Sequence, residues 1–335
     1  MTSPGSLAGK RVLVTGAAGF IGSHLVEALV AEGAAVRALV HYNARNDWGN
    51  LELVAPAIRD QVDVRLGDIQ DPFGVAAMAS DRDVIFHLAA LIGIPYSYVH
   101  PASYVNVNVT GTLNVLEAAR RFDIERLVHT STSETYGTAQ YTPIDEKHPL
   151  QGQSPYSASK IGADKLAESY ARSFGTPVVT LRPFNTFGPR QSLRAVIPTI
   201  IAQAVGGGPV RLGSLTPVRD FTYVTDTARA FIAAATAPSG ANGLTLNAGN
   251  GRGITIGELA DQILAIVGGD AQLTGDEAER IRPANSEVFE LIADASLLRE
   301  QTGWAPQVTL REGIERTVEF VRERLSALKP HLYTI

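Results

Sequence analysis

Short runs of apolar and β-branched residues recur along the first half of the chain. The first run, Arg11–Gly16, breaks at a glycine, and apolar residues then follow at helical spacing until Gly33. Runs of the same kind lie at Ala35–Val40, Val62–Leu66, Asp83–Ala90, Arg126–Ser131 and Val178–Arg182. Apolar runs without alternation are typical of strands buried on both faces of a sheet. The pattern therefore predicts six strands of one parallel sheet.

Helical spacing separates these runs, notably over Ala102–Phe122 and from about Pro155 to Phe174. Strands that alternate with helices through short links require right-handed crossovers. The fold class predicted is therefore α/β, with a doubly wound parallel sheet of the Rossmann type.

After Pro183 the alternation loosens, which indicates a smaller second α/β domain. The elements expected there are helices near Ala195–Val205, Gly257–Val267 and Leu310–Leu328, and short strands at Val210–Leu212 and Asp220–Val224. Thr245–Asn247 reads as a strand that returns to the first sheet, so the two domains should interleave. We expect residues 10–183 plus about 220–250 to bind a dinucleotide, and residues 184–219 plus about 251–330 to bind the substrate.

Composition narrows the function classes. The 335 residues suffice for about two domains, and 34 acidic against 29 basic residues disfavour a nucleic-acid partner. Without cysteine there is no disulfide framework, thiolate zinc site or cysteine nucleophile, which favours the cytosol. The polar start Met1–Gly9 and the lack of a long apolar stretch predict neither a secretory signal nor a membrane span. The seven histidines form no pair with metal-ligand spacing.

Three glycines, Gly16, Gly19 and Gly22, stand where the first predicted strand meets the first helix. Backbone amides at such a turn bind a pyrophosphate, although a glycine turn that serves packing alone has the same pattern. The segment from Thr15 to Gly22 resembles the Thr-Gly-x-x-Gly-Phe-x-Gly motif of the extended short-chain dehydrogenase/reductase family. The resemblance adds Phe20 and Ile21 to the cofactor contacts.

Tyr156 and Lys160 lie four residues apart at the start of a predicted helix, and therefore on one face of it. An ammonium group beside a phenol favours the phenolate, which suits general acid and base work. Tyr-x-x-x-Lys is also common on solvated helix faces, but here Thr132 precedes it directly after the fifth strand. This order resembles the catalytic triad of the family, which implies that Thr132, Tyr156 and Lys160 are catalytic.

The segment Thr132-Ser133-Glu134 resembles nucleotide-sugar 4,6-dehydratases of that family, whereas its 4-epimerases lack the glutamate. A dehydratase must remove the C5 proton of a 4-keto sugar, so it needs a carboxylate base, and the resemblance implies that Glu134 supplies it. Ser133 stands where dTDP-glucose dehydratases have an aspartate and where GDP-mannose dehydratases have serine. The general acid for loss of the C6 hydroxyl stays open, since Glu134 could also return its proton.

The resemblance extends to residues that would contact the substrate and the cofactor. Arg182-Pro183-Phe184-Asn185 is similar to an Arg-Pro-x-Asn motif whose asparagine contacts the sugar diphosphate. Three arginines correspond to positions that bind phosphate or ribose, although each could equally form a structural ion pair: Arg190, Arg219 and Arg282. Expected at the adenine are Asp68 and Ile69, and along the nicotinamide Leu88, Ala89 and Ala90.

The residue after the second strand normally selects the dinucleotide, being acidic for NAD and basic for NADP. Here it is His41, which decides neither. Arg37 could face the other side of the sheet, and Arg45 lies in the following loop. The resemblance implies NAD, and NADP is not excluded.

Together these resemblances imply a nucleotide-sugar 4,6-dehydratase that oxidises C4, eliminates water across C5 and C6, and returns the hydride to C6. Three segments, Ala35–Trp48, Ala89–Tyr98 and Gln140–Ser159, most resemble the dehydratases of the legionaminic acid pathway, which implies UDP- or GDP-linked N-acetylglucosamine as substrate. The rival interpretations are a 4-epimerase and a nucleotide-sensing regulator without turnover. The nucleotide, the sugar and the stereochemistry at C5 stay open.

The resemblance also implies a homodimer built on the helices at 102–122 and 155–174. We expect apolar residues on their outward faces, among them Leu116, Ile161 and Leu166.

Overall fold

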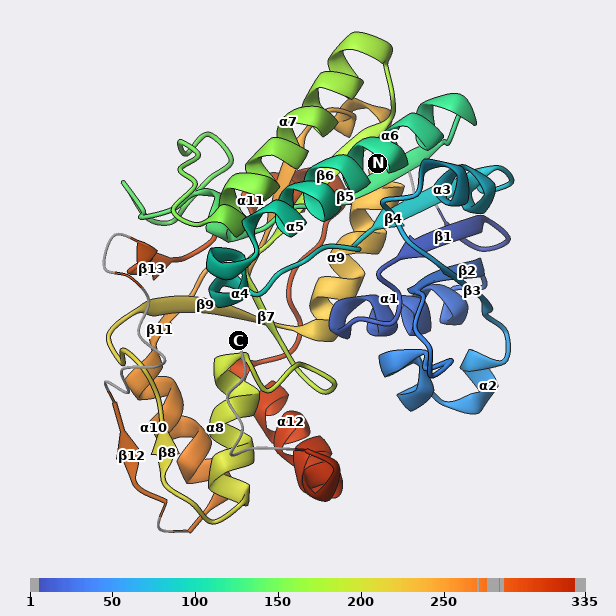
Figure 1. The fold of residues 1–335 in the computed structure, drawn as a ribbon. Helices are drawn as coiled ribbons and strands as arrows, with labels where there is room; N and C mark the ends of the chain where they lie inside the picture. The colour runs from blue at the N-terminus through green and yellow to red at the C-terminus, as the bar shows by residue number, and fades with distance from the viewer. Residues whose placement is uncertain (1–5, 270, 276–282, 284–285, 329–335) are drawn as a thin grey trace.

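Seven parallel strands form one sheet in the order β10-β6-β5-β4-β1-β2-β3 (Figure 1). The computed structural model describes residues 6–269, 271–275, 283 and 286–328. The strands are β1 (Arg11–Thr15), β2 (Ala35–His41), β3 (Asp63–Gly67), β4 (Val84–His87), β5 (Arg126–Thr130), β6 (Val178–Pro183) and β10 (Thr245–Ala248). This order reverses between β1 and β4, where open α/β sheets bind their ligands. The predicted Rossmann-type sheet is confirmed, and so is the return of Thr245–Asn247 to it.

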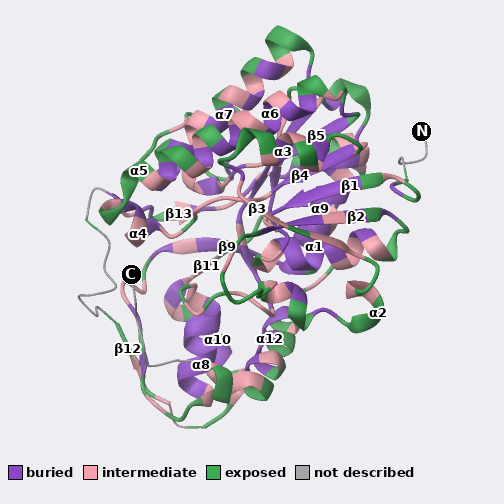
Figure 2. Ribbon diagram, turned by 45° about the vertical axis from the view of Figure 1, so that its right-hand side comes forward, coloured by how far each residue is buried: buried purple, intermediate pink, exposed green. Residues whose placement is uncertain are grey.

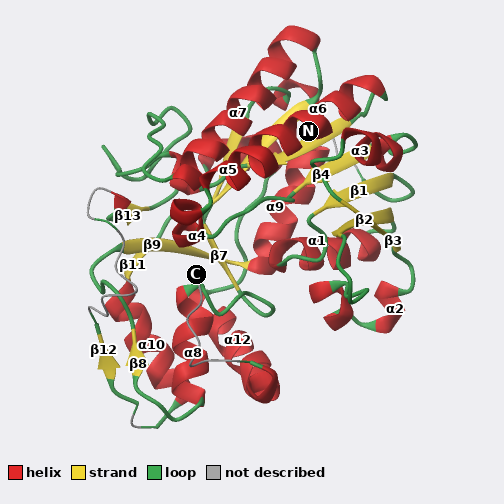
Figure 3. Ribbon diagram, viewed as in Figure 1, coloured by secondary structure: helices red, strands yellow, loops and turns green. Residues whose placement is uncertain are grey.

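Helices cover both faces of the large sheet (Figure 3). In β1, Val12 and Val14 join the apolar cluster under α1 (Phe20–Ala31) and α9 (Val224–Thr236), whereas Leu13 joins the cluster on the opposite face. That face carries α3 (Pro72–Ala79), α6 (Gly111–Arg121) and α7 (Pro155–Phe174). The strands are mostly buried, except for the edge strand β3, and the outer sides of the helices are exposed (Figure 2).

A smaller lobe packs below the carboxyl ends of the large sheet (Figure 1). Its core lies among α8 (Val196–Val205), α10 (Ile256–Val267) and α12 (Leu310–Arg324). β9 (Val218–Tyr223) pairs with β7 (Asn185–Phe187), β11 (Gly253–Thr255) and β13 (Glu290–Leu291), and β8 (Val210–Arg211) pairs with β12 (Leu273–Thr274). The remaining helices are α2 (Pro56–Arg59), α4 (Ile94–Val99), α5 (Pro101–Tyr104) and α11 (Ser296–Thr302). The domain limits given above stay a prediction.

The structure corrects several expected elements. The strand expected over Asp83–Ala90 ends at His87, and the helix expected over Ala102–Phe122 contains a π-helical segment, Val105–Thr110. The strand expected to reach Val224 ends at Tyr223, where the alanine-rich α9 begins, an element that the apolar pattern missed. The expectation that Leu116 lies on an outward face is wrong, because its side chain is fully buried between α6 and the sheet.

Candidate active site

A cavity of about 880 Å³ lies where the carboxyl ends of β1, β2, β4, β5 and β6 meet the smaller lobe. Its walls bring together most of the predicted site residues. These are Gly16, Gly19, Phe20, Ile21, Gly22, His41, Leu88, Ala89, Ala90, Thr132, Ser133, Glu134, Tyr156, Lys160, Asn185 and Arg219.

The glycine turn forms one end of the cavity. Gly16 has φ +69°, and a Cβ atom there would lie 2.7 Å from the backbone nitrogen of Ala89. A Cβ atom on Gly22 would lie 2.2 Å from the carbonyl oxygen of Gly16. Gly19 is the N-cap residue of α1 and makes no side-chain hydrogen bond. The backbone amides of the first turn, whose residues line the cavity, therefore have no side-chain acceptor. This end of the cavity therefore has the shape and the donors of a pyrophosphate site.

Tyr156 and Lys160 enter the cavity from the first turns of α7. That helix has Pro155 at its first position and a capping box between Ser154 and Ser157, which together fix where it begins. Both functional side chains are buried. Thr132 follows β5, and its hydroxyl oxygen accepts a hydrogen bond from the backbone nitrogen of Glu134 at 3.3 Å. The local structure thus places the three residues of the predicted triad in the wall of one cavity.

The electrostatics of the tyrosine differ from the sequence expectation. Burial raises the pKa of Tyr156 above its usual value, and a hydrogen bond with Thr132 opposes this only in part. Burial also lowers the pKa of Lys160 to about 8, while the charge of Asp164 acts in the other direction. The ammonium group donates to the carbonyl oxygen of Thr130 at 2.6 Å. Lys160 therefore does not produce a phenolate at Tyr156 in this arrangement.

Ser133 and Glu134 form a short 3-10 turn in the cavity wall. Ser133 is buried, and the negative charge of Glu134 contributes to the raised pKa of Tyr156. A carboxylate and a phenol thus line the same cavity, which is the arrangement that proton transfer at two neighbouring carbons requires.

The predicted substrate residues separate into two groups. Asn185 lines the cavity, and its buried side-chain nitrogen has no hydrogen-bond partner among the described residues. Arg219 also lines it and donates to the carbonyl oxygen of Val218 at 3.0 Å. Arg190 is not a lining residue, because its guanidinium group is held by Glu27 and His24 of α1. Arg282 lies outside the described residues.

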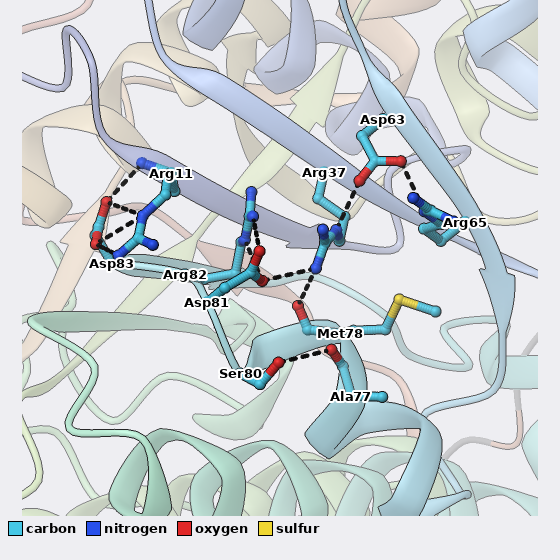
Figure 4. A network of polar contacts seen from close by, with 10 residues as sticks. All are labelled: Arg11, Arg37, Asp63, Arg65, Ala77, Met78, Ser80, Asp81, Arg82 and Asp83. Carbon is cyan, nitrogen blue, oxygen red and sulfur yellow. Dashed lines mark hydrogen bonds and ion pairs between the residues drawn. The ribbon is translucent and has the colours of Figure 1, made fainter.

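At the adenine end, Asp68 and Ile69 lie beyond the cavity lining. Asp68 is 3.6 Å from the ring of His41, which does line the cavity, and Ile69 is buried beneath α6. Arg37 faces away, bonded to Asp63 at 2.8 Å and to Asp81 at 2.8 Å (Figure 4). The network in Figure 4 therefore holds Arg37 between two carboxylates, and Arg37 does not line the cavity.

Sequence reasoning missed several lining residues from the smaller lobe. They are Gln191, Arg194, Thr199, Ser214 and Glu287. These residues come from loops and from a helix that carry no motif, so no sequence signal marked them. In the described part of the chain, no group of three histidine or acidic residues could hold a metal ion, and no helix is long and apolar enough to cross a membrane.

Comparison with known proteins agrees with this geometry. The sequence model of the GDP-mannose 4,6-dehydratase family matches residues 13–317. The chain belongs to this family. Family membership makes it an enzyme of the NAD-dependent nucleotide-sugar dehydratase and epimerase type, and it accounts for the cavity shared by the sheet and the smaller lobe.

Similar members of the family carry two different activities in their names. The UDP-glucose 4-epimerase of Mycolicibacterium smegmatis is 35% identical, covering 94% of this chain and 99% of the relative. The dTDP-glucose 4,6-dehydratase of an Actinoplanes species is 33% identical over 94% of this chain and 99% of the relative. The dTDP-glucose 4,6-dehydratase of Streptomyces venezuelae, solved with NAD and TYD bound, superposes with a TM-score of 0.84 at 30% identity, covering 96% of this chain and 99% of that one.

Proposed function

We propose that this chain is an NAD-dependent nucleotide-sugar 4,6-dehydratase. The observation that carries the proposal is the carboxylate of Glu134 in the wall of the cavity that also holds Thr132, Tyr156 and Lys160. An epimerase moves only a proton and a hydride at C4, whereas a dehydratase must also take the proton from C5. The dTDP-glucose 4,6-dehydratases among the relatives support this assignment.

The residues present fit NAD. The uncapped first turn of α1 and the Gly16 cradle would hold its pyrophosphate, with His41, Asp68 and Ile69 toward the adenosine. Leu88, Ala89, Ala90 and Lys160 would hold the nicotinamide end. When bound, NAD supplies the acceptor for the C4 hydride and its donor at C6.

The chain's own residues would move the protons. In the complex with cofactor and substrate, Tyr156 accepts the proton of the C4 hydroxyl as the phenolate, and its oxygen is hydrogen-bonded to Thr132. Glu134 then removes the proton from C5, which the C4 ketone has made acidic. The C6 hydroxyl leaves as water with the proton that Glu134 carries, passed on directly or through Ser133, which lies beside it, and C5 takes a proton from solvent as C6 receives the hydride. Asn185 and Arg219 bind the nucleotide diphosphate, because Asn185 presents an amide nitrogen that has no hydrogen-bond partner among the described residues and Arg219 presents a cation at the cavity wall.

The proposed substrate is UDP- or GDP-linked N-acetylglucosamine. A 4-epimerase is the second candidate, because a UDP-glucose 4-epimerase is among the similar relatives. Purified protein incubated with UDP-, GDP- and dTDP-linked hexoses, each with and without the N-acetyl group, distinguishes the two activities by product mass. Loss of water from one nucleotide sugar supports the dehydratase, and a C4 epimer of unchanged mass contradicts it.

A further inference from the structure

Asp164 lies one helical turn after Lys160 on α7, and its side chain is 5% exposed. Three donors surround its carboxylate: the Ser131 hydroxyl at 2.6 Å, the Arg182 guanidinium at 2.7 Å and the His129 ring at 3.1 Å. No motif in the sequence marks this acid. Its partners come from β5, from the residue directly after β5, and from β6. The carboxylate, which is carried by α7, therefore joins three elements of the site: α7, β5 and β6.

Each of these elements carries a proposed site residue. Ser131 precedes Thr132 at the end of β5, and Arg182 stands three residues before Asn185 at the end of β6. The Arg182 Nε atom also donates to the Ser131 hydroxyl oxygen at 3.1 Å. Because α7 carries Tyr156 and Lys160, the carboxylate of Asp164 holds all three elements in register with one another.

The charges in this cluster are unbalanced without Asp164. Burial lowers the pKa of His129, and its Nδ1 atom has no hydrogen-bond partner in the described part of the chain, so the neutral ring donates through Nε2 rather than forming an ion pair. Burial also lowers the pKa of His87 on β4, with the charge of Lys160 acting in the same direction. The charged groups left in this cluster are the two cations, Lys160 and Arg182, and the carboxylate of Asp164, while the charge of Glu134 acts on the phenol of Tyr156 from the cavity wall.

We propose that Asp164 is a positioning residue for Lys160: its negative charge keeps the buried ammonium ion protonated, and its hydrogen bonds hold the strand ends that carry Thr132 and Asn185. This inference rests on the proposed function, in which Lys160 binds the nicotinamide end of NAD. Removing the charge leaves two buried cations without a counter-ion, which is costly, and Lys160 relieves the cost by losing its proton.

The affinity of the full chain for NAD, measured by calorimetry between pH 6 and pH 10 after removal of bound nucleotide, tests the proposal. In the wild type we expect affinity to fall as Lys160 deprotonates, with a midpoint near its pKa of about 8. Asp164→Asn should lower that midpoint by at least ~1 pH unit. Above the wild-type midpoint, the affinity of the variant for NAD should therefore be about tenfold or more below that of the wild type. An unchanged midpoint would overturn the proposal.

Asp226→Asn is the matched control. Asp226 is equally buried on a helix, pairs with Arg229, and accepts from the backbone nitrogens of Gln307 and Val308 at 2.9 Å. Its loss should reduce stability without moving the midpoint. An equal shift in both variants would show a general effect of destabilisation and overturn the proposal.

A second variant acts in the opposite direction. Arg182→Gln removes the competing cation, so Asp164 stabilises the charge of Lys160 alone and the midpoint should rise. A lower midpoint in the Arg182→Gln variant contradicts the proposal, and this test holds even if Asp164→Asn does not fold. A wild type that binds no NAD at any pH would overturn the proposed function, and this inference with it, whereas wild-type binding with no response to either variant overturns the role of Asp164 alone.

Discussion

The ammonium group of Lys160 donates a hydrogen bond to the main-chain carbonyl oxygen of Thr130, with an Nζ to O distance of 2.6 Å. The lysine is thereby anchored to the end of β5, while the phenol of Tyr156 is hydrogen-bonded to Thr132. Because burial raises the pKa of Tyr156, its hydroxyl is protonated at neutral pH in this arrangement. The basicity that catalysis requires must therefore develop when cofactor and substrate bind.

Tyr156→Phe removes the group that accepts the proton of the C4 hydroxyl. We expect turnover to fall by at least ~10² while the nucleotide sugar still binds. Rates and substrate affinity measured together check this result. Tyr170→Phe serves as the control, since that hydroxyl donates to Glu117 of α6 and does not line the cavity. Near-normal turnover in the Tyr156 variant would discard the triad assignment.

Lys160→Ala should weaken NAD binding and reduce turnover together, because the proposed ammonium contact to the cofactor is lost. Calorimetric affinity and initial rates provide the two measurements. Lys165→Ala is a suitable comparison, since Lys165 is exposed and pairs with Glu168 on the same helix. If only the unfolding temperature of the Lys160 variant changed, the residue would be structural.

Glu134→Gln keeps the size of the side chain but removes the base. Oxidation at C4 should survive while the C5 proton stays in place, so the 4-keto sugar should accumulate without loss of water. Mass spectrometry in deuterium oxide measures both steps, and deuterium should no longer enter at C5. A variant that dehydrates as fast as the wild type would show that Glu134 is not the base.

We expect a homodimer through α6 and α7. Leu116 does not contribute, being buried in the core, but Ile161 and Leu166 are partly exposed on α7. Light scattering should give twice the chain mass, and Ile161→Glu should favour the monomer by placing a charge in the interface. A monomer mass that does not change with concentration would refute the dimer.

Stability should depend on pH through His24. Burial lowers its pKa to about 4, with the charge of Arg190 acting in the same direction. The neutral ring donates to the carbonyl oxygen of Pro189 at 3.0 Å and accepts from Arg190 at 2.9 Å. The unfolded chain, with an ordinary histidine pKa near 6.5, binds more protons between pH 4 and pH 6.5, so stability must rise with pH in that window.

The expected loss on going from pH 7 to pH 5 is about 2 kcal/mol from this residue. Urea unfolding at the two pH values measures it. In His24→Gln the difference between the two pH values should shrink by that amount, whereas His41→Gln, which replaces an exposed histidine, should leave it unchanged. An equal pH dependence in wild type and His24→Gln would contradict the assignment.

The sequence by itself determined the features that depend on local spacing. Strands buried on both faces are mostly apolar along their length, so most of the six predicted strands of the sheet are visible without tertiary information; β3, at the edge of the sheet, carries Asp63 and Arg65. Gly16 and Gly22 are dictated by close backbone approaches, and the four-residue spacing of Tyr156 and Lys160 places them on one helix face. These signals are short in range, and the structure sets their residues around one cavity.

Only the tertiary structure decided which partners distant residues find. The apolar spacing of Leu116 does not tell which side of its helix meets the sheet, because several sides of a helix carry apolar residues and only packing selects among them. Arg190 finds Glu27, and Asp164 finds Arg182, through contacts between segments that are far apart in sequence or lie on different elements. An arginine has the same sequence signal whether it binds a phosphate or a carboxylate, because its charge and donors serve both equally.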